Sequence, residues 1–488
     1  MEADHKTKVD DIAATVRQFH DSQQPFRIYH GSTNSTRRVQ YQRDKVVDTS
    51  GLTNIWAIDT EKKTVRTEPN VPMDKLVEST LDHGLVPLVV MEFPGITVGG
   101  GFSGTSGESS SFRHGVFHRT VNWIEIVLAD GECTTASPSD KDDLFWGAAS
   151  SLGSLGIVTM LEIRLMEAQP YVELTYHPES SLELAVKKTE EITADPSNDY
   201  LDGIVFARDK VIICSGRFVG VLPKGIEVQR FTRAQDQWFY RHVEKIAASN
   251  DFPRVDYIPL VDYLFRYDRG AFWTGKYAFR YFLTPFNRIT RYLLDNFMHT
   301  RVMYHALHES GLADQYIVQD VSVPYAALTD FFEWLHGNFS YYPLWLCPLK
   351  QNGYNNPVTS GLLADKPDEP DYYMNVGIWG PGSTNRQIFI EQNRQLEHKV
   401  HLVGGQKCLY AQTYYTEDEF WASYNRKEYD ALRSKYRAWN LPSVYDKVRA
   451  TERPMPFRIW PLSGLYGVYK VWRGGDYLIQ NRRAQTGP

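Results

Sequence analysis

Residues 94–111 read PGITVGGGFSGTSGESSS, from Pro94 to Ser111. Six of these residues are glycines and seven carry a hydroxyl group. Glycine lets a backbone pass close to an anion in conformations that other residues avoid, so that several N–H groups point at one guest. Serine and threonine hydroxyls add further donors. The composition therefore favours a cradle for a diphosphate, although a flexible surface loop has the same composition.

The same stretch contains a G-x-G-x-x-G pattern at Gly99, Gly101 and Gly104. This pattern marks a Rossmann dinucleotide site only where a strand precedes it and a helix follows it. The following residues 105–111 are poor helix formers, since they consist of Ser, Thr, Gly and one Glu. The residues that follow the pattern therefore argue against a Rossmann site. Residues 91–118 are predicted to form a long loop.

Short strands and helices surround this loop in an irregular order. The periodicity of apolar residues predicts helices over 8–20, 71–83 and 139–150, and strands over 26–29, 45–48, 55–59, 64–67, 85–90, 121–128, 132–136 and 157–165. The third helix is predicted to be capped by Ser139, with Asp142 three residues on. Because strands and helices do not alternate regularly, the pattern indicates an α+β fold.

Beyond Pro170 the sequence indicates a second group of elements. Strands are predicted over 171–177, 203–207 and 211–216, and helices over 180–193, 233–248 and 328–337. Residues 352–370 are rich in Pro, Asn, Gly and Asp and are predicted to form a surface loop.

Composition excludes several classes of protein. The 488-residue chain has a formal net charge of -6, which argues against nucleic-acid binding. No apolar run of about 18 residues occurs, so no transmembrane helix is predicted. The four cysteines form no CxxC pair, and the two HxxH pairs, at His305 and His398, have no clear third ligand, so no metal is predicted. The aromatic fraction, 14%, indicates either an aromatic-rich core or a wide apolar pocket.

Three segments downstream of the glycine-rich stretch carry a resemblance, namely residues 127–131, 143–148 and 153–159. In order and spacing they resemble the FAD-binding domain of the vanillyl-alcohol oxidase/p-cresol methylhydroxylase superfamily. The resemblance implies that the glycine-rich stretch lies along the FAD diphosphate, helped by an earlier loop and a Gly-Ile-Val turn. The implied cofactor-binding residues are His30, Gly31, Ser32, Thr33, Asn34, Thr97, Val98, Gly99, Gly100, Gly101, Phe102, Ser103, Gly104, Thr105, Ser106, Gly107, Glu108, Ser109, Gly156, Ile157 and Val158.

Further segments are similar to the Δ24-sterol reductase (24-dehydrocholesterol reductase, Diminuto) family. They are residues 108–111, 256–260, 272–273, 318–320, 342–348, 409–411, 419–421 and 444–447. The chain departs from this family at Gln412, where an acidic residue is usual, and in an extra aromatic C-terminal tail. The resemblance implies an FAD-binding domain over 1–168 and a cap domain over 169–400, with a mixed sheet covered by helices. Residues 401–488 would return to the flavin domain.

The resemblance also implies an activity. NADPH would reduce the flavin, and the flavin would reduce an isolated C=C of a lipophilic sterol or terpenoid-like substrate. An unpolarised alkene also needs a proton, for which Tyr257, Tyr410, Tyr414 and Glu108 are candidates, although a buried tyrosine more often has a packing role. The alternatives are a flavin oxidase or desaturase that uses oxygen, and a lipid-binding protein without catalysis.

Flavin attachment and location follow from the same reasoning. His30 and His114 raise the question of a covalent flavin, but the reductase branch implies non-covalent FAD. The chain is expected to be cytoplasmic. Peripheral contact with the endoplasmic reticulum membrane through the aromatic and basic tail remains an alternative, with docking of the tail on the protein favoured. The oligomeric state is not predicted.

Overall fold

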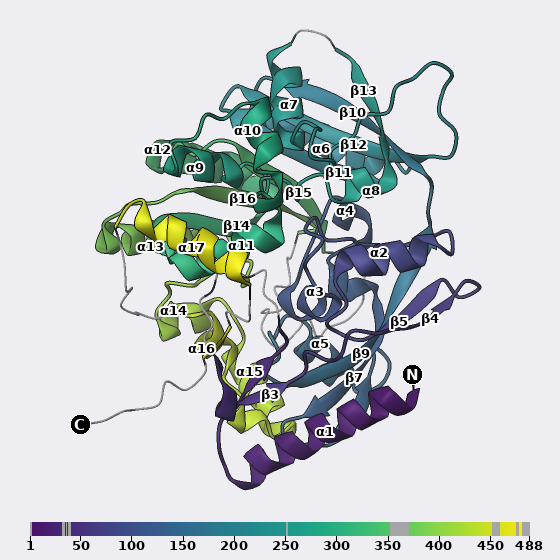
Figure 1. The fold of residues 1–488 in the computed structure, drawn as a ribbon, viewed down its shortest axis with the longest axis vertical. Coiled ribbons are helices and arrows are strands. Elements are labelled where there is room, and N and C mark those ends of the chain that lie inside the picture. Colours follow the sequence, from purple (N-terminus) through teal and green to yellow (C-terminus); the bar gives the residue numbers. More distant parts are fainter. Residues whose placement is uncertain are drawn as a thin grey trace.

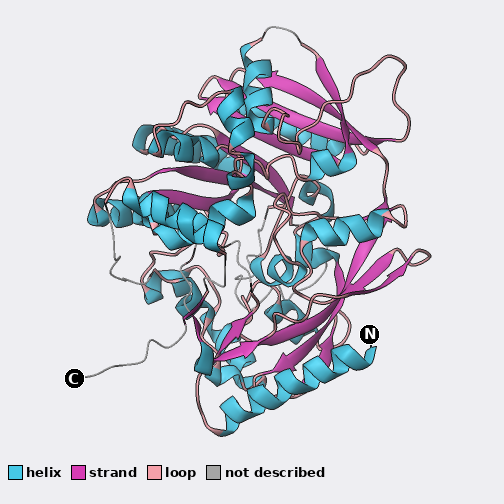
Figure 2. Ribbon diagram, in the orientation of Figure 1, coloured by secondary structure: helices cyan, strands magenta, loops and turns pink. Residues whose placement is uncertain are grey.

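The computed structural model describes residues 2–31, 35, 37, 41–249, 252–351, 370–450, 459–474 and 478–480. Ser32, Thr33, Asn34, most of the predicted loop at 352–370 and part of the C-terminal tail lie outside the described residues. The described chain forms two large sheets with helices packed on them, and the N-terminal sheet lies below the central one in Figure 1. The expected α+β fold is confirmed, as the mixture of helices and strands in Figure 2 illustrates.

The first sheet contains six of the eight strands that were predicted around the glycine-rich stretch. It has the order β4 (Ile55–Asp59), β5 (Thr64–Thr67), β9 (Gly156–Glu167), β7 (Val121–Leu128) and β8 (Cys133–Ala136), with β6 (Leu85–Pro87) also paired to β9. The helices α2 (Met73–Leu81) and α5 (Asp142–Ala148) lie beside it. The expected cap at Ser139 is wrong, because α5 begins after Lys141, whose φ is 51°, and has no side-chain cap.

Small strand pairs complete the N-terminal part. They are β1 (Arg27–Tyr29) with β3 (Val46–Asp48) and β2 (Tyr41–Gln42) with β18 (Ile479–Gln480), both parallel. The first of these pairs holds Arg27 near the site described below.

The N-terminal helix α1 (Glu2–Asp21) contacts the first sheet through ionic hydrogen bonds of its buried His5. Its apolar face buries Val9, Ile12 and Val16. His5 Nδ1 lies 2.8 Å from Glu68 Oε1, and His5 Nε2 lies 2.9 Å from Glu125 Oε1. Although burial lowers the pKa of His5, its bonds to both carboxylates outweigh that effect and raise the pKa to about 9. His5 therefore carries a proton in the folded protein at neutral pH.

We expect His5→Gln to destabilise the protein in a pH-dependent way. A pKa that folding raises to about 9 gives a stabilisation that is complete below the unfolded value and is lost as the pH rises through 9. The variant should lose about 3 kcal/mol of unfolding free energy at pH ~6 and far less at pH ~10. Guanidinium unfolding at the two pH values measures this, and an equal loss at both would contradict the ionic role of His5.

The glycine-rich stretch is more ordered than the sequence predicted. Residues 98–104 form a short helix, α3 (Val98–Gly104), and a second turn, α4 (Ser111–His114), follows, so the prediction of one long loop is wrong. Thr97 caps α3 by accepting a hydrogen bond from the Gly100 N–H at 3.2 Å. A Cβ on Gly99 would lie 2.6 Å from Pro69 Cβ, and one on Gly101 would lie 2.4 Å from Met91 Cε. Close packing by glycine therefore stabilises a helix that intrinsic propensity disfavours.

The second sheet holds the central part of the chain. Its strand order is β13 (Arg254–Pro259), β10 (Tyr171–Glu179), β12 (Lys210–Val219), β11 (Tyr200–Ala207), β15 (Leu344–Lys350), β16 (Tyr372–Pro381), β14 (Tyr316–Pro324) and β17 (Gln406–Lys407). Every described pair in it is antiparallel, so the expected mixed sheet is corrected to an antiparallel one.

Helices cover this sheet and connect its strands (Figure 1). They are α6 (Leu182–Ala194), α7 (Phe239–Ala248), α8 (Leu260–Leu264), α9 (Thr274–Tyr281), α10 (Arg288–Leu293), α11 (Thr300–Ser310), α12 (Leu328–Asn338) and α13 (Arg386–Leu402). Much of the aromatic content is buried among them, for example Trp238 and Trp273. Among the described residues, no helix is both long enough and apolar enough to cross a membrane.

The C-terminal helices separate into two groups. The helices α14 (Glu417–Ala422), α15 (Arg426–Lys435) and α16 (Val444–Val448) share a small apolar core, and Tyr429 of α15 donates to Ser154, just before β9, at 2.8 Å. The last helix, α17 (Leu462–Arg473), instead packs along α11.

Candidate active site

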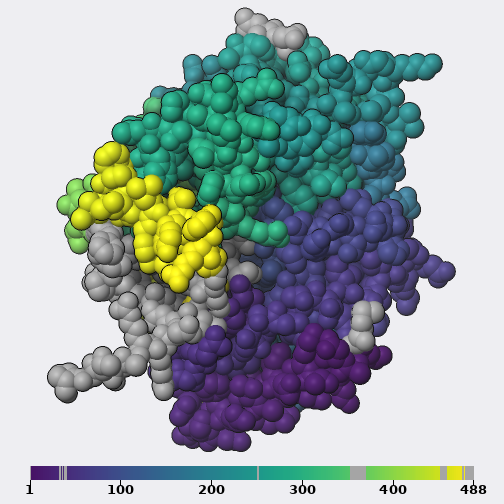
Figure 3. Space-filling view, viewed as in Figure 1, coloured from purple at the N-terminus to yellow at the C-terminus, as the bar shows by residue number. Residues whose placement is uncertain are grey.

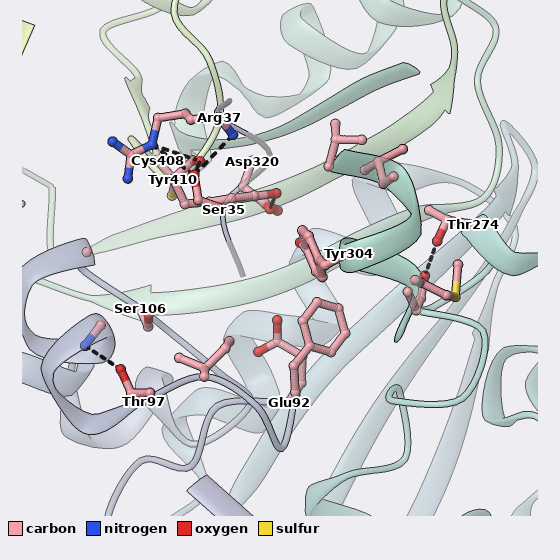
Figure 4. Close-up of a pocket in the computed structure, with 18 of the residues that line it drawn as sticks. Ser35, Arg37, Glu92, Thr97, Ser106, Thr274, Tyr304, Asp320, Cys408 and Tyr410 are labelled. Carbon is pink, nitrogen blue, oxygen red and sulfur yellow. Dashed lines mark hydrogen bonds between the residues drawn. The ribbon is translucent and has the colours of Figure 1, made fainter. Parts of the chain in front are cut away.

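A cavity of about 480 Å³ lies between the glycine-rich stretch and the second sheet. Its size falls in the usual range for small-molecule sites. One end is lined by α3, the turn before β9 and the short strand β1, and the other by α9, α11, β14 and α17. Figure 4 shows Thr97, Thr274, Tyr304 and Asp320, which come from distant parts of the sequence, around this space.

Many of the residues predicted to hold the cofactor line one end of this cavity. Those that line it are His30, Thr97, Gly99, Gly100, Ser103, Gly104, Thr105, Ser106, Gly107, Gly156, Ile157 and Val158. Others lie elsewhere: Val98, Gly101 and Phe102 are buried in the core behind the helix, and Gly31 is exposed. A Cβ on Gly104 would meet open space, so this glycine leaves its stretch of backbone accessible from the cavity.

Two half-buried cations, Arg37 and Lys447, lie at the same end of the cavity. Arg37 donates to the Tyr410 carbonyl at 3.3 Å and to the Lys447 carbonyl at 3.0 Å. The Lys447 ammonium donates to the Leu152 and Gly153 carbonyls at 2.7 and 3.1 Å. Burial, and then the charges of neighbouring arginines, lower the pKa of Lys447 well below its usual value. The charged neighbours of Lys447 are cations, so an anion in the cavity would stabilise this group.

His30 adds an unused polar group at this position. Its Nδ1 is buried and has no hydrogen-bond partner among the described residues. Burial, together with the charges of Arg37 and Lys447, lowers the pKa of His30 to about 4, so the ring is neutral. Two cations with no carboxylate partner among the described residues, an orphaned ring nitrogen and a glycine-lined wall together suit a diphosphate-bearing ligand such as FAD.

The other end of the cavity is apolar and aromatic. Its wall is formed by Phe93, Phe272, Tyr277, Tyr281, Phe282, Phe297, Met298, Val302, Met303, Tyr304, Leu307, Leu312, Tyr316, Val318, Trp345, Trp379, Val468 and Val471. The high aromatic content of the sequence therefore serves both the core and this wall.

An acid and a tyrosine from the second sheet meet in the cavity. The Tyr410 hydroxyl donates to Asp320 Oδ2 at 2.5 Å, and Asn375 donates to Asp320 Oδ1 at 3.0 Å. Trp379 Nε1 donates to the Tyr410 oxygen at 3.3 Å. Burial raises the pKa of Asp320 to about 6 despite these bonds. The bond to Asp320 directs the Tyr410 proton away from any ligand in the cavity.

Glu92 is a second acid in the cavity, on the wall opposite the sheet. It follows β6 and precedes the glycine-rich stretch, and its carboxyl group points into the space between Ser106 and Tyr304 in Figure 4. Burial, followed by the charges of Glu108 and Asp320, raises its pKa well above the usual value. The raised pKa favours the protonated form of Glu92, whose proton a ligand in the cavity could accept.

The structure does not bring the other predicted catalytic side chains to the cavity. Tyr257 lies on the edge strand β13 and donates to Glu173 of β10 at 2.7 Å. Tyr414 donates to Gln412 at 3.2 Å and does not line the cavity. Of the tyrosines predicted as proton donors, Tyr410 alone lines it.

Glu108 joins the glycine-rich stretch to the second sheet. Its carboxylate lies 3.3 Å from Arg266 Nη2, which also pairs with Asp202 of β11 at 2.8 Å. The neighbouring Ser109 carbonyl accepts from the Leu201 N–H at 2.7 Å. Burial raises the pKa of Glu108 to about 7, but its carboxyl group faces this ion group and does not line the cavity. Glu108 and Ser109 thus connect the glycine-rich stretch to the second sheet, and neither lines the cavity, so the expected contact of each with the ligand stays a prediction.

The sequence analysis missed Arg37, Lys447, Glu92 and Asp320. Lys447 and Asp320 lie inside segments that carry the family resemblance, and this position could have marked them as candidate functional residues. Glu92 directly precedes the glycine-rich stretch, but a single acid in a loop has no distinguishing pattern. No metal-binding group of three or more His, Cys, Asp or Glu side chains occurs among the residues that the structure describes.

Comparisons with known proteins show the family of this chain. A family model described as an FAD binding domain matches residues 6–137. The Delta(24)-sterol reductases of Rattus norvegicus and Homo sapiens are each 30% identical over 459 residues, covering 91% of this chain and 86% of the relative. That of Arabidopsis thaliana is 30% identical over 458 residues, covering 86% of this chain and 80% of the relative. The chain carries an FAD-binding domain and belongs to the Δ24-sterol reductase family of FAD-binding oxidoreductases.

Proposed function

We propose that this protein uses FAD and NADPH to reduce an isolated C=C of a sterol or terpenoid-like lipid. The observation that carries the proposal is one cavity with a cationic, glycine-lined end and an aromatic, apolar end, with an acid between them. The names of the relatives, Delta(24)-sterol reductase, agree with such a substrate. The domain boundaries that we propose remain 1–168, 169–400 and 401–488.

The cationic end would hold the diphosphate of FAD. Arg37 and Lys447 supply positive charge, and the residues around Gly104 supply accessible backbone. The neutral His30 is placed to donate or accept one hydrogen bond. FAD bound there would take a hydride from NADPH and pass it to one carbon of the alkene.

The aromatic end would hold the hydrocarbon body of the substrate. Burying apolar surface there supplies binding free energy of roughly 25 cal/mol per Å². An isolated alkene gains positive character at one carbon as a proton arrives at the other, and aromatic faces stabilise such charge. Phe93, Phe272 and Tyr304 provide faces of this kind near Glu92.

We assign the proton to Glu92. A neutral carboxyl group is a much stronger acid than a tyrosine, and the pKa of Tyr410 is itself raised by burial and by the charge of Asp320. The Tyr410–Asp320 pair would then act as a positioning group, holding the wall of the second sheet in place and linking it to Ser35, which donates to the Tyr410 carbonyl at 2.6 Å.

Product analysis tests the proposal. Protein loaded with FAD and supplied with NADPH, without oxygen, should convert a sterol with a side-chain double bond into a product heavier by two hydrogens. Mass spectrometry measures this gain. Loss of two hydrogens in the presence of oxygen would instead assign the chain to the desaturase alternative. Unchanged sterol under both conditions would indicate no catalysis.

We also expect the flavin to be held without a covalent bond. The His30 ring faces the cationic end, where the diphosphate is proposed to lie, and His114 does not line the cavity. Acid precipitation of the yellow protein should therefore release the flavin into the supernatant, where its absorbance is measured. A yellow pellet after denaturation would contradict this expectation.

A further inference from the structure

The last described helix, α17, presents an apolar outer face to solvent. Seven of the nineteen large hydrophobic side chains recorded as exposed fall within residues 459–472. They are Ile459, Trp460, Leu462, Leu465, Tyr466, Tyr469 and Trp472. Trp472 is 78% exposed, and Leu283, which follows α9, is 75% exposed. We call these eight side chains the α17 patch. Such a concentration exceeds the scattered exposure that is normal on soluble proteins.

The inner face of α17 is firmly held. A Cβ on Gly464 would lie 2.4 Å from Tyr281, and one on Gly467 would lie 2.7 Å from the Ala306 carbonyl of α11. Trp460 Nε1 donates to the Tyr281 carbonyl at 2.8 Å. Figure 3 shows α17, in yellow, on the surface beside the green segments that follow α8. The helix is therefore a fixed part of the surface, as the expected docking of the tail on the protein requires.

The same helix forms part of the cavity wall. Gly464, Val468 and Val471 line the cavity from the inner side of α17. The α17 patch is thus separated from the apolar end of the cavity by the thickness of one helix. A surface that binds apolar molecules at this position would lie next to the apolar end of the cavity.

The charged side chains of the α17 segment are both basic. Residues 459–474 contain Lys470 and Arg473 and no Asp or Glu, in a chain whose net charge is -6. Arg473 is exposed at the end of the helix, and the Lys470 ammonium lies 3.6 Å from Glu309 of α11. Arg280, at the end of α9 before Leu283, is also exposed. Tryptophan and tyrosine beside basic side chains are the composition of helices that lie in a membrane interface.

We propose that the α17 patch binds the surface of a lipid bilayer that contains anionic lipids. Tryptophan, tyrosine and leucine side chains enter the boundary between headgroups and acyl chains, and Arg473 contacts the headgroups. The bilayer is favoured over a second copy or another protein because the charge of the patch complements anionic headgroups, and because the patch is continuous with a wall of the apolar cavity. This inference requires no turnover, so it stands or fails separately from the proposed reaction.

Vesicle flotation with the full, FAD-loaded chain tests it. The wild type should float with vesicles of phosphatidylcholine and phosphatidylserine, and more weakly with phosphatidylcholine alone or at high salt. The double variant Leu465→Ser, Trp472→Ser removes two side chains of the patch that do not line the cavity. It should lower the partition coefficient at least about tenfold.

A matched control removes exposed apolar side chains from another surface. Leu402 and Trp439 are 65% and 51% exposed and lie outside the patch, so Leu402→Ser, Trp439→Ser should bind vesicles as the wild type does. Thermal melting and flavin content show that both variants fold.

Three results would overturn the proposal. They are a wild type that does not float, equal binding by the two double variants, and a sedimentation shift from dimer to monomer in the patch variant without vesicles. The last result would assign the patch to a second copy of the chain.

Discussion

Glu92→Gln is expected to slow reduction of the C=C by roughly 10²–10⁴-fold, the usual contribution of a general acid. Glutamine keeps the size and polarity of the side chain but has no acidic proton. Because the step in which NADPH bleaches the flavin needs no proton from this side chain, its rate should be unchanged. Single-turnover measurements of the two steps separate these effects.

The pH dependence gives this prediction a second readout. Burial and neighbouring negative charge raise the pKa of Glu92, and only the protonated form donates. The wild-type rate of C=C reduction should therefore fall as the pH rises through this raised pKa, and the slow rate of Glu92→Gln should not follow that titration.

Two control variants narrow the assignment. Tyr257→Phe should keep the wild-type rate, because Tyr257 bonds to Glu173 at the sheet edge and does not line the cavity. Tyr410→Phe removes the bond to Asp320 and should have an effect of a few fold, as a positioning group would. If Tyr410→Phe abolished the reaction and Glu92→Gln did not, the proton would come from Tyr410.

Lys447→Met is expected to weaken FAD binding by about 30- to 140-fold. A charge-assisted contact between an ammonium and a phosphate is worth about 2–3 kcal/mol when buried, and about 1.4 kcal/mol corresponds to a factor of ten. Fluorescence titration of the apoprotein with FAD measures the dissociation constant. The control is Lys435→Met, because Lys435 is exposed, pairs with Asp143 and does not line the cavity.

Alkaline pH should reproduce part of this effect in the wild type. Burial and neighbouring cations lower the pKa of Lys447 in the empty site, whereas the negative diphosphate would favour its charged form. FAD affinity should thus decrease as the pH rises through the lowered pKa, and Lys447→Met should remove this dependence. If the FAD affinity of Lys447→Met stayed within twofold of the wild-type affinity at all pH values, Lys447 would not contact the diphosphate.

The glycine-rich stretch carried most of the information on the fold. Its composition indicated an anion cradle or a flexible loop, and the family resemblance of the segments around Gly131, Trp146 and Gly156 then implied the flavoprotein class. The strands around the stretch were predicted from alternating apolar residues. The alternation of apolar and polar residues along a strand is a local pattern, so a sequence alone can reveal it. The helix α3 was missed because its stability comes from Pro69, Met91 and Phe117, which pack where its glycines have no side chain.

The site was less predictable than the fold. Arg37 and Lys447 are 410 positions apart, and they meet where Tyr429 and Lys447 contact residues 152–154, just before β9. Tyr257 and Tyr410 look alike in sequence, yet one lies on an edge strand and the other reaches Asp320 in the cavity. The two tyrosines differ in their position in the sheet and in their burial, and the local sequence pattern predicts neither property.

Anaerobic stopped-flow absorbance tests the central claim most directly. FAD-loaded protein is first mixed with NADPH and then with a sterol that has an isolated side-chain double bond. The flavin absorbance should bleach with NADPH and return when the sterol is added in the absence of oxygen. A flavin that does not respond to NADPH, or one that is reoxidised by oxygen but not by the sterol, would contradict the proposed reductase.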